Sequence, residues 1–539
     1  MEKRTTPKSV THSQIVAKGY SHGGASHTKR AFKGFNVSSG APSEDIDANN
    51  YTLRQRSRML YMAAPIATGA LKRQRTNIVG SGLWLKSTID RDALGMTKEQ
   101  AEAWQRKVQA EFALWAEKGQ NCDATRLNNF YGMQQLVALA WPMSGDVFAV
   151  VKRAEVTALA PYSLRLHLIE ADRVRTPTDS GNVFAANQTK GKAKNGNVIY
   201  DGVEVDGNGA VVAYYFANTY PYQYDGTPTE FVRVEAYGKE MKLPNVLHIM
   251  DSERPEQYRG VPYLAQVIEP LLQLRRYTEA EITSAVIQAF LAAFVTTEAG
   301  ADDIPFNEVG GGSPGGIVGT GVQDLDEIGG KESNEYDMGP GTMFVMEPGE
   351  KVDTLAPSHP NSGFDKFVRA MAEQVGAALE IPADLLMMSF NASYSASRAA
   401  LLEAWKGFSM RREWLADSFC RPVYELWLTE AVARGRISAP GFLTDPLIRQ
   451  AYLGSEWIGP AQGTLNPVQE VQAEVTAVEN GFTTREAVAV KLNGSEYVRN
   501  VDKLTTENEL LRAANGGTTH AAPAKPPENP KEQEGNPDE

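Results

Sequence analysis

The chain has 539 residues, of which 42% are hydrophobic and 22% charged, and its formal net charge is −12. A chain of this length and composition can fold into about three to four domain-sized units without a disulfide or a metal to stabilise it. The negative charge excludes proteins that grip duplex DNA through a globally basic surface, because neutralising phosphates is what gives those proteins their affinity.

The cysteine content and the apolar runs indicate in which cellular compartment the protein assembles. Cys122 and Cys420 are far apart and form no CxxC pair, which predicts two buried thiols and neither a disulfide framework nor a zinc site. No apolar stretch typical of a secretory signal follows the N-terminus. The longest nearly apolar run, 285–295, is shorter than the ~20 residues of a membrane span. We therefore expect assembly in the cytoplasm and no membrane partner.

The N-terminal part of the chain is predicted to be an arm followed by helices. Residues 1–49 are rich in Ser, Gly, Lys and His, and we expect them to be disordered. Residues 50–76 follow an apolar helical pattern that Pro65 interrupts, which predicts two helices or a kink. The next predicted elements are an extended segment over 77–85, an amphipathic helix over 97–118 and a helix over 130–141 that ends at Pro142.

The middle of the chain changes from a β pattern to a helical one. Residues 146–250 alternate or run β-branched, with Asp206-Gly207-Asn208-Gly209 as a turn between two strands. Helical periodicity covers 263–298, about 50 Å if continuous, and Pro270 could introduce a kink.

The last third of the chain is predicted to be irregular at first and then helical. Residues 299–362 are punctuated by Gly and Pro, which favours a small β-rich subdomain or long loops. The remaining predictions are a helix over 363–380, a break at Ile381-Pro382, a long helix over 397–432 bent near Pro422, short helices to 512 and a disordered tail over 513–539.

The sequence contains no complete catalytic motif. Residues 311–315 match G-x-S-x-G, but Pro314 stands where the oxyanion donor is needed and has no N–H. Lys331 ends a stretch similar to a phosphate loop, yet Glu332 replaces the required Ser or Thr. His167, His248 and His359 have no partner at metal-ligand spacing. The sequence therefore predicts no enzyme, no cofactor and no metal.

Several strings occur in one order and carry a family resemblance. They include NIVGSGLWL, LRLHLIEADRVRTP, RPEQYRGVP and NASYSASRAALLEAW, within a shared pattern over about 50–490. In this order they resemble the lambda family of tailed-bacteriophage portal proteins, the head–tail connectors. The resemblance implies a mixed α+β portal fold with long stem helices that forms a cyclic ring.

The portal fold has named parts, and the resemblance places each of them on the chain. The implied parts are the wing over 50–262, a stem helix over 263–298, the clip over 299–362, a second stem helix over 363–381, the tunnel loop over 382–396, a long wing helix over 397–432 and a helical crown over 433–512.

The family resemblance also implies the function. The chain would be one subunit of a homo-oligomeric ring, a dodecamer, at one vertex of the virion capsid. Double-stranded DNA would pass through the ring during packaging and ejection, which suits an acidic chain that lets DNA slide. The implied protein partners are the terminase large subunit, the major capsid or scaffold protein, and head-completion or tail connector proteins. Two alternatives stay open: a metal-dependent DNA-processing enzyme, and a capsid or scaffold protein without DNA contact.

Three groups of residues are candidates for this function. By resemblance, the channel-facing tunnel loop contains Met387, Met388, Ser389, Phe390, Asn391 and Tyr394. The alternative is that its Met and Phe side chains pack into a subunit core. On the second stem helix, Lys366 and Arg369 could make weak phosphate contacts or simply lie on a solvated face.

The third group is a structural joint before the long helix, made by Arg254, Pro255, Arg259, Gly260 and Pro262. The prolines would fix a rigid entry into the helix. Alternatively, the two arginines could pair across a subunit boundary.

Overall fold

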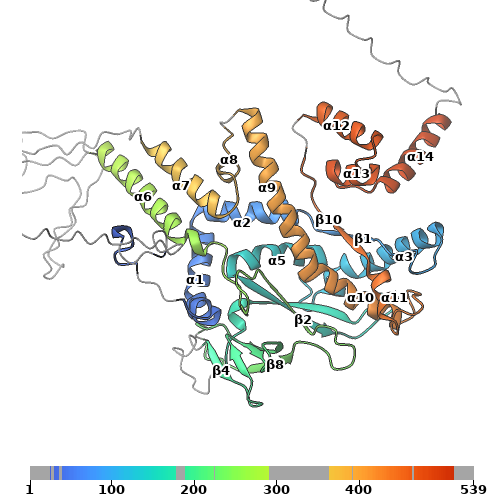
Figure 1. Ribbon diagram of the computed structural model, residues 1–539, viewed down its shortest axis with the longest axis horizontal. Coiled ribbons are helices and arrows are strands. Elements are labelled where there is room, and N and C mark those ends of the chain that lie inside the picture. The colour runs from blue at the N-terminus through green and yellow to red at the C-terminus, as the bar shows by residue number, and fades with distance from the viewer. Residues whose placement is uncertain are drawn as a thin grey trace, which may run out of the picture.

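The computed structural model describes residues 25, 29–35, 39–177, 189–223, 225–290, 363–390, 393–463 and 466–514. The protein is mixed α+β, with the two larger sheets at one end, a central group of helices, and two helical projections at the other end (Figure 1). The predicted clip over 299–362 and most of both predicted arms lie outside the described residues. Among the described helices, none combines the length and apolar content needed to cross a bilayer.

The helices fall into a central group, a pair of projecting helices and a C-terminal group. The central helices are α1 (Ala48–Ala63), α2 (Pro65–Ile78), α3 (Lys98–Ala116), α4 (Gly119–Cys122), α5 (Phe130–Ser144), α8 (Ala383–Met387), α9 (Tyr394–Leu415), α10 (Arg421–Ala433) and α11 (Pro446–Leu453). The projecting pair is α6 (Ile268–Phe290) and α7 (Phe364–Ala378), and the C-terminal group is α12 (Pro467–Glu479), α13 (Arg485–Asn493) and α14 (Tyr497–Ala514).

The strands of the described residues form three antiparallel sheets. A two-stranded sheet pairs β1 (Trp84–Ser87) with β10 (Ser455–Ile458). A three-stranded sheet has the order β3 (Leu164–Glu170), β2 (Asp146–Arg153), β9 (Val246–Met250). A five-stranded meander runs through β4 (Lys190–Lys192), β5 (Val198–Tyr200), β6 (Val203–Val205), β7 (Val211–Ala217) and β8 (Phe231–Glu235).

Three apolar cores hold these elements together. The largest packs α3, α5, α9 and α10 against one face of the β3-β2-β9 sheet, with Phe112 edge-on to Trp427 at its centre. A second core joins α1 and α2 to the start of α6 and to α7 and α8. The third lies between the other face of β2 and the meander, around Phe148 and Phe216.

The effect of each proline on its helix depends on where in the helix the proline lies. As Pro65 predicts, residues 48–78 form two helices, and Pro65 itself starts α2. The prediction that Pro142 ends its helix is wrong, because α5 continues to Ser144 and stops at Gly145, where φ is +91°. Pro270 lies in the first turn of α6, where a missing N–H costs no hydrogen bond.

The last predicted segments have different boundaries in the structure. The long helix begins at Tyr394 rather than Ser397, because Ser393 Oγ accepts a hydrogen bond from Ala396 N and caps it. Residues 416–420 form a π-helical turn where a bend near Pro422 was expected.

Residues 433–512 are not uniformly a helical crown. The strand β10 and buried Ile437, Phe442 and Trp457 belong to the largest core. Only α12 to α14 stand apart, with no buried residue. Partly exposed ion pairs such as Arg398–Glu470, at 3.2 Å, join them to the rest.

Candidate functional site

The predicted tunnel loop follows two packed helices. Tyr277 of α6 stacks on Phe364 and lies 4.5 Å from the Phe367 ring centroid, so α6 and α7 run side by side (Figure 1). After α7 the chain reverses through Glu380, whose φ is +51°, and buried Ile381. The break predicted at Ile381-Pro382 is therefore present, and it is followed by the short helix α8.

The end of α8 exposes apolar side chains. Leu386 is buried in the second core, whereas Met387, Met388 and Phe390 are 38%, 64% and 50% exposed. Met388 ends α8 in the left-handed region with φ +55°, which turns the following residues away from the helix. In this chain the two methionines and the phenylalanine thus do not pack into the core, which was the alternative expectation.

The structure describes the other three predicted loop residues only in part. Ser389 is half-buried, and its N–H donates to Asp384 O at 3.0 Å. Asn391 lies outside the described residues. Tyr394 is the first residue of α9, but its side chain is not among those described.

The two predicted stem cations differ in their partners. Arg369 is paired with Asp384 of α8 at 2.9 Å and with Glu373 at 3.3 Å, so its charge is neutralised and it ties α7 to α8. Lys366 is exposed, and no carboxylate in the described ranges lies within ion-pair distance of it. Of the two, Lys366 is the one whose charge is open to an external phosphate.

A polar link joins this region to the long helix α9. Arg411, which is largely buried, donates to Glu380 Oε2 at 2.8 Å and to the Tyr263 hydroxyl at 2.6 Å. The Tyr263 hydroxyl in turn donates to Leu379 O. Arg411 therefore holds the turn between α7 and α8 against both α9 and the chain entering α6.

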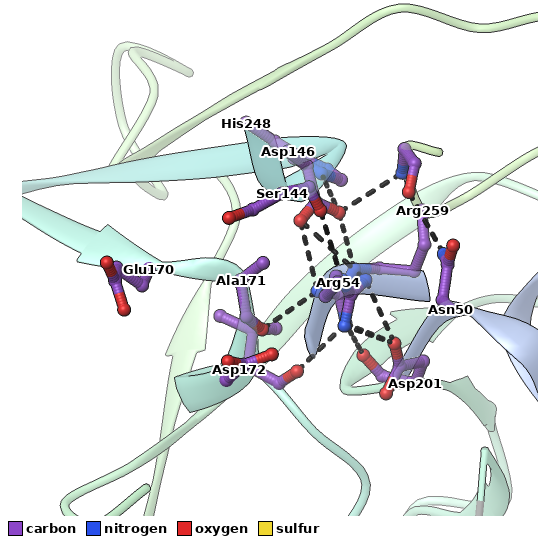
Figure 2. A network of polar contacts seen from close by, with 12 residues as sticks. Asn50, Arg54, Ser144, Asp146, Glu170, Ala171, Asp172, Asp201, His248 and Arg259 are labelled. Carbon is purple, nitrogen blue, oxygen red and sulfur yellow. Dashed lines mark hydrogen bonds and ion pairs between the residues drawn. The ribbon is translucent and has the colours of Figure 1, made fainter. Parts of the chain in front are cut away.

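The predicted joint is the centre of a buried ionic network, shown in Figure 2. Arg259 is fully buried and binds Asp146 through Nε and Nη2 at 2.6 and 3.2 Å. It also pairs with Asp201 Oδ2 at 2.7 Å. Its remaining N–H groups donate to backbone carbonyls of Val174, Asp201 and Ala171, so all five N–H groups have acceptors. Arg259 is thus satisfied within the chain, which contradicts pairing across a subunit boundary.

Helix α1 completes the network from the N-terminal side. Arg54 lies 3.4 Å from Asp201 Oδ2 and donates to Ser144 O at 3.2 Å, while Asn50 donates to Gly260 O at 3.0 Å. One turn further on, Arg58 pairs with Asp172. Segments that are far apart in the sequence therefore meet at one buried cluster of charges (Figure 2).

The network sets the protonation of its members. Burial alone would raise the pKa of Asp146, but Arg259 and Arg54 hold that pKa well below its ordinary value. Burial lowers the pKa of His248, whose Nε2 lies 3.3 Å from Asp146 Oδ2, so the ring is neutral at pH 7. Burial and the nearby Asp201 raise the pKa of Asp47 to about 7. The cluster is therefore a charge-balanced support and offers no free acid–base pair.

The rest of the joint is held by backbone contacts. A Cβ placed on Gly260 would lie 1.9 Å from Gly145 O, so this crossing needs glycine. Tyr263 N donates to Pro142 O at 2.8 Å, and Pro262 O accepts from Ala265 N at the start of a 3₁₀ turn that leads into α6. Pro255 lies in the exposed turn before it.

Arg254 binds the N-terminal segment of the same chain. Its Nη1 lies 2.7 Å from Asp45 Oδ2, and its Nη2 donates to Gly40 O at 3.1 Å. As with Arg259, the partners are within the chain. The joint therefore fastens residues 40–54 as well as the entry to α6.

Sequence reasoning identified Arg259 but missed most of its partners. Nothing in the sequence singles out Asp146 or Asp201, because each lies at an ordinary turn and carries no motif. Tyr263 and Arg411 lie in segments with helical periodicity, which predicts their helices but not their contact with each other. The one usable signal was an arginine between Gln257 and Gly260 in a turn bracketed by prolines, a place where a long charged side chain has few solvated positions.

In the described part of the chain, His, Cys, Asp and Glu side chains form no group of three that could hold a metal ion. Both cysteines are buried and unbridged, and burial raises the pKa of Cys122 to about 12. Neither thiol is arranged as a nucleophile.

Known proteins provide a comparison. The family described as "Phage portal protein, lambda family" matches residues 28–412. Portal protein B of Escherichia phage lambda is 24% identical over 521 residues, which cover 92% of this chain and 90% of that protein. The portal protein of Escherichia phage N15 is 24% identical over 511 residues, covering 92% and 91%. A chain in the neck of a native GTA particle, solved with C12 symmetry, aligns with a TM-score of 0.36 and 14% identity over 83% of this chain and 94% of that one.

Proposed function

The chain belongs to the lambda family of phage portal proteins, and on this premise we propose that it closes into a ring of twelve copies through which double-stranded DNA passes. As a portal protein it is a structural component of the virion, at the capsid vertex, and not an enzyme. A cyclic ring requires head-to-tail interfaces that close on themselves.

The exposed end of α8 is the observation that carries the DNA-channel proposal. Met387, Met388 and Phe390 are uncharged and exposed at the end of α8, next to Leu386, which is buried in the second core. Repeated around a ring, such side chains would narrow the bore without fixed charges that bind phosphates. A neutral constriction lets a duplex slide, whereas a ring of cations would retain it.

The charges of Lys366 and Arg369 are consistent with weak contact to DNA. Arg369 is already neutralised by Asp384 and Glu373, which leaves Lys366 as the exposed cation of the predicted stem pair. One exposed lysine per copy provides weak contacts that salt screens. We propose that Lys366 guides DNA and that Arg369 serves to hold α8 in place.

The remaining roles follow from membership of the family. We propose that the ring binds the terminase large subunit during packaging and later the head-completion or tail connector proteins. Contact with the major capsid or scaffold protein would place it at its vertex. The division into wing, stem, clip and crown stays a prediction.

Ring formation is tested by size-exclusion chromatography with light scattering, followed by negative-stain imaging of the purified chain. An annular particle with a central hole is the expected result. A compact single molecule that cleaves DNA in the presence of a divalent metal would favour a DNA-processing enzyme instead. Large open shells would favour a capsid or scaffold protein.

The neutral constriction is tested by Met388→Lys, with Leu159→Lys as a control at an exposed loop position. We expect Met388→Lys rings to package DNA several-fold more slowly in an in vitro reaction, with the rate partly restored at higher salt. The control adds the same charge and should package normally. Equal packaging by both variants would remove Met388 from the channel wall.

A further inference from the structure

Helix α14 stands clear of every core in the described chain. All side chains over 501–514 are exposed, and only its first turn is tied to α13, through Tyr497 N donating to Glu486 Oε2 at 2.9 Å. An isolated helix of this length is marginal in water, because its hydrogen bonds barely offset the cost of nucleation. A helix that receives so little support from its own chain needs a partner.

Three apolar residues of α14 and one asparagine follow a heptad pattern, and Val498 and Leu510 lie outside it. Val501, Leu504, Asn508 and Leu511 are spaced by three, four and three residues, so they form one stripe along the helix. In heptad terms, Val501 and Asn508 occupy a positions and Leu504 and Leu511 occupy d positions. A β-branched residue at a with leucine at d is the combination that favours two parallel strands.

The polar residues of the same helix select another copy of this chain as the partner. In a parallel, in-register pair, Asn508 lies opposite Asn508 of the second copy, and the two amides can bind each other. An antiparallel pair would place the Asn508 amide against Leu504 and leave it without a hydrogen-bond partner.

Charges beside the stripe agree with the parallel arrangement. Glu507 occupies a g position and Arg512 an e position, five residues later, which are the two positions that face each other across a parallel pair. Each pair of helices would therefore gain two such ion pairs. No described residue of the same chain forms an ion pair with either side chain.

We propose that α14 of one copy packs in parallel and in register against α14 of a second copy through Val501, Leu504, Asn508 and Leu511. The inference rests on the proposed ring, since two heptads are short and need copies already held close together. Each α14 can pair with only one neighbour, so a ring of twelve copies would hold six such pairs. It adds to that function a homotypic contact at the C-terminal end of the subunit.

Cysteine cross-linking in the full-length chain tests the pairing. Leu504→Cys and Leu511→Cys introduce a thiol at d positions, and Thr506→Cys introduces one on the opposite side of the helix. The native cysteines are buried, and burial raises the pKa of both, so the introduced thiol is the reactive one. Under mild oxidation we expect at least tenfold more disulfide-linked dimer from the d-position variants than from Thr506→Cys.

A charge reversal gives an independent test of the register. In the Leu511→Cys background, Glu507→Arg places two arginines opposite each other and should reduce the dimer yield about threefold. The additional change Arg512→Glu should restore it. Equal yields from Leu511→Cys and Thr506→Cys, or no restoration by the double reversal, would overturn the parallel pair.

Negative-stain images of the same samples separate this inference from the proposed function. Rings without d-position cross-links contradict the α14 contact and leave the portal assignment intact. Failure of the unsubstituted chain to form rings contradicts the ring itself.

Discussion

Arg259 and Asp146 carry opposite charges in a site with no access to solvent. Burying such a pair costs desolvation, and the attraction recovers that cost only when every donor and acceptor is bound. Here all five N–H groups of Arg259 have acceptors, and Asp146 also accepts from Gly260 N at 3.1 Å. The pair therefore fixes the relative position of β2 and the joint more than it adds net stability.

The crossing of Gly145 and Gly260 should be intolerant of any side chain. Gly260→Ala would force a Cβ to within 1.9 Å of a backbone oxygen, and we expect the free energy of unfolding to fall by at least about 2 kcal/mol in urea titrations. Gly207→Ala is the matched control, because no atom lies within 4 Å of its Cβ position, and a change under about 0.5 kcal/mol is expected. A stable Gly260→Ala chain would show that the crossing can open.

Asp47 should make stability depend on pH. Its folded pKa of about 7 lies above the ordinary value of 3.8, so the folded state holds a proton that the unfolded chain has lost. Its stabilising contribution is complete below pH 3.8 and is lost as pH rises to about 7. Asp47→Asn removes this loss. The free energy of unfolding of Asp47→Asn should therefore exceed that of the unsubstituted chain by about 2 kcal/mol more at pH 8 than at pH 5.5.

The control for that measurement is Asp92→Asn, a well-exposed carboxylate whose removal should change the free energy of unfolding by less than about 0.5 kcal/mol at either pH. If the gain from Asp47→Asn were equal at both pH values, Asp47 would have to be ionised in the folded chain throughout.

The partners of Arg259 could not be predicted from single residues. Asp146 and Asp201 are two of 66 acidic residues, and nothing local distinguishes them from those that lie in solvent. Their role depends on two turns meeting in space, which is information about tertiary contacts. Arg259 was noticed because of its setting between prolines, but setting alone does not tell whether an arginine binds inside or outside its own chain.

At the scale of elements, the turn between α7 and α8 is held by side chains from two other segments. Arg411 reaches Glu380 and Tyr263, and Arg369 reaches Asp384. Helix α8 is thus fixed at its first residues, while the apolar residues at its C-terminal end are exposed. Such an element can keep its position in the assembly while its C-terminal end contacts a moving partner.

Arg411→Met should loosen the first residues of α8. We expect faster hydrogen exchange of the α8 amides over 383–387 and a loss of about 1–2 kcal/mol in the free energy of unfolding. Arg421→Met is a control further along the same helical stretch, where the arginine makes partly exposed ion pairs with Glu413 and Asp417 that contribute little. Exchange in α8 that is no faster than in the control would assign the fixing of the turn to Tyr263 alone.

Long periodic elements were predictable and short paired ones were not. The amphipathic helix over 97–118 corresponds to α3, because its apolar residues repeat over five turns. The strand β10 has only four residues and lies directly after α11, so periodicity could not separate it from a helix. Its identity comes from pairing with β1, as in Trp84 opposite Ile458.

At the scale of the whole molecule, the chain divides into a body with three connected cores and a C-terminal group without one. The body includes β10, which brings residue 458 back to the beginning of the fold. The group of α12 to α14 has no buried residue and contacts the body through partly exposed ion pairs, among other contacts. The family match ends at residue 412, within the body.

A chain that ends at residue 463 should therefore keep the body folded. We expect its near-ultraviolet circular dichroism and the midpoint of thermal unfolding to match those of the full chain within about 2 °C. A chain that ends at residue 453 lacks β10 and buried Trp457, and should lose cooperative unfolding. Loss of the native signal in the longer truncation would mean that α12 to α14 support the body.

The pairing of β1 with β10 has a consequence for how the protein is made. Strand β1 leaves the ribosome more than 300 residues before the strand that covers it, a delay on the order of tens of seconds at ordinary translation rates. During that interval Trp84 and its neighbours present an unpaired edge beside an incomplete core. The nascent polypeptide must be shielded from its fellow chains over this period, so slow synthesis or scarce chaperones should reduce the yield of soluble subunits.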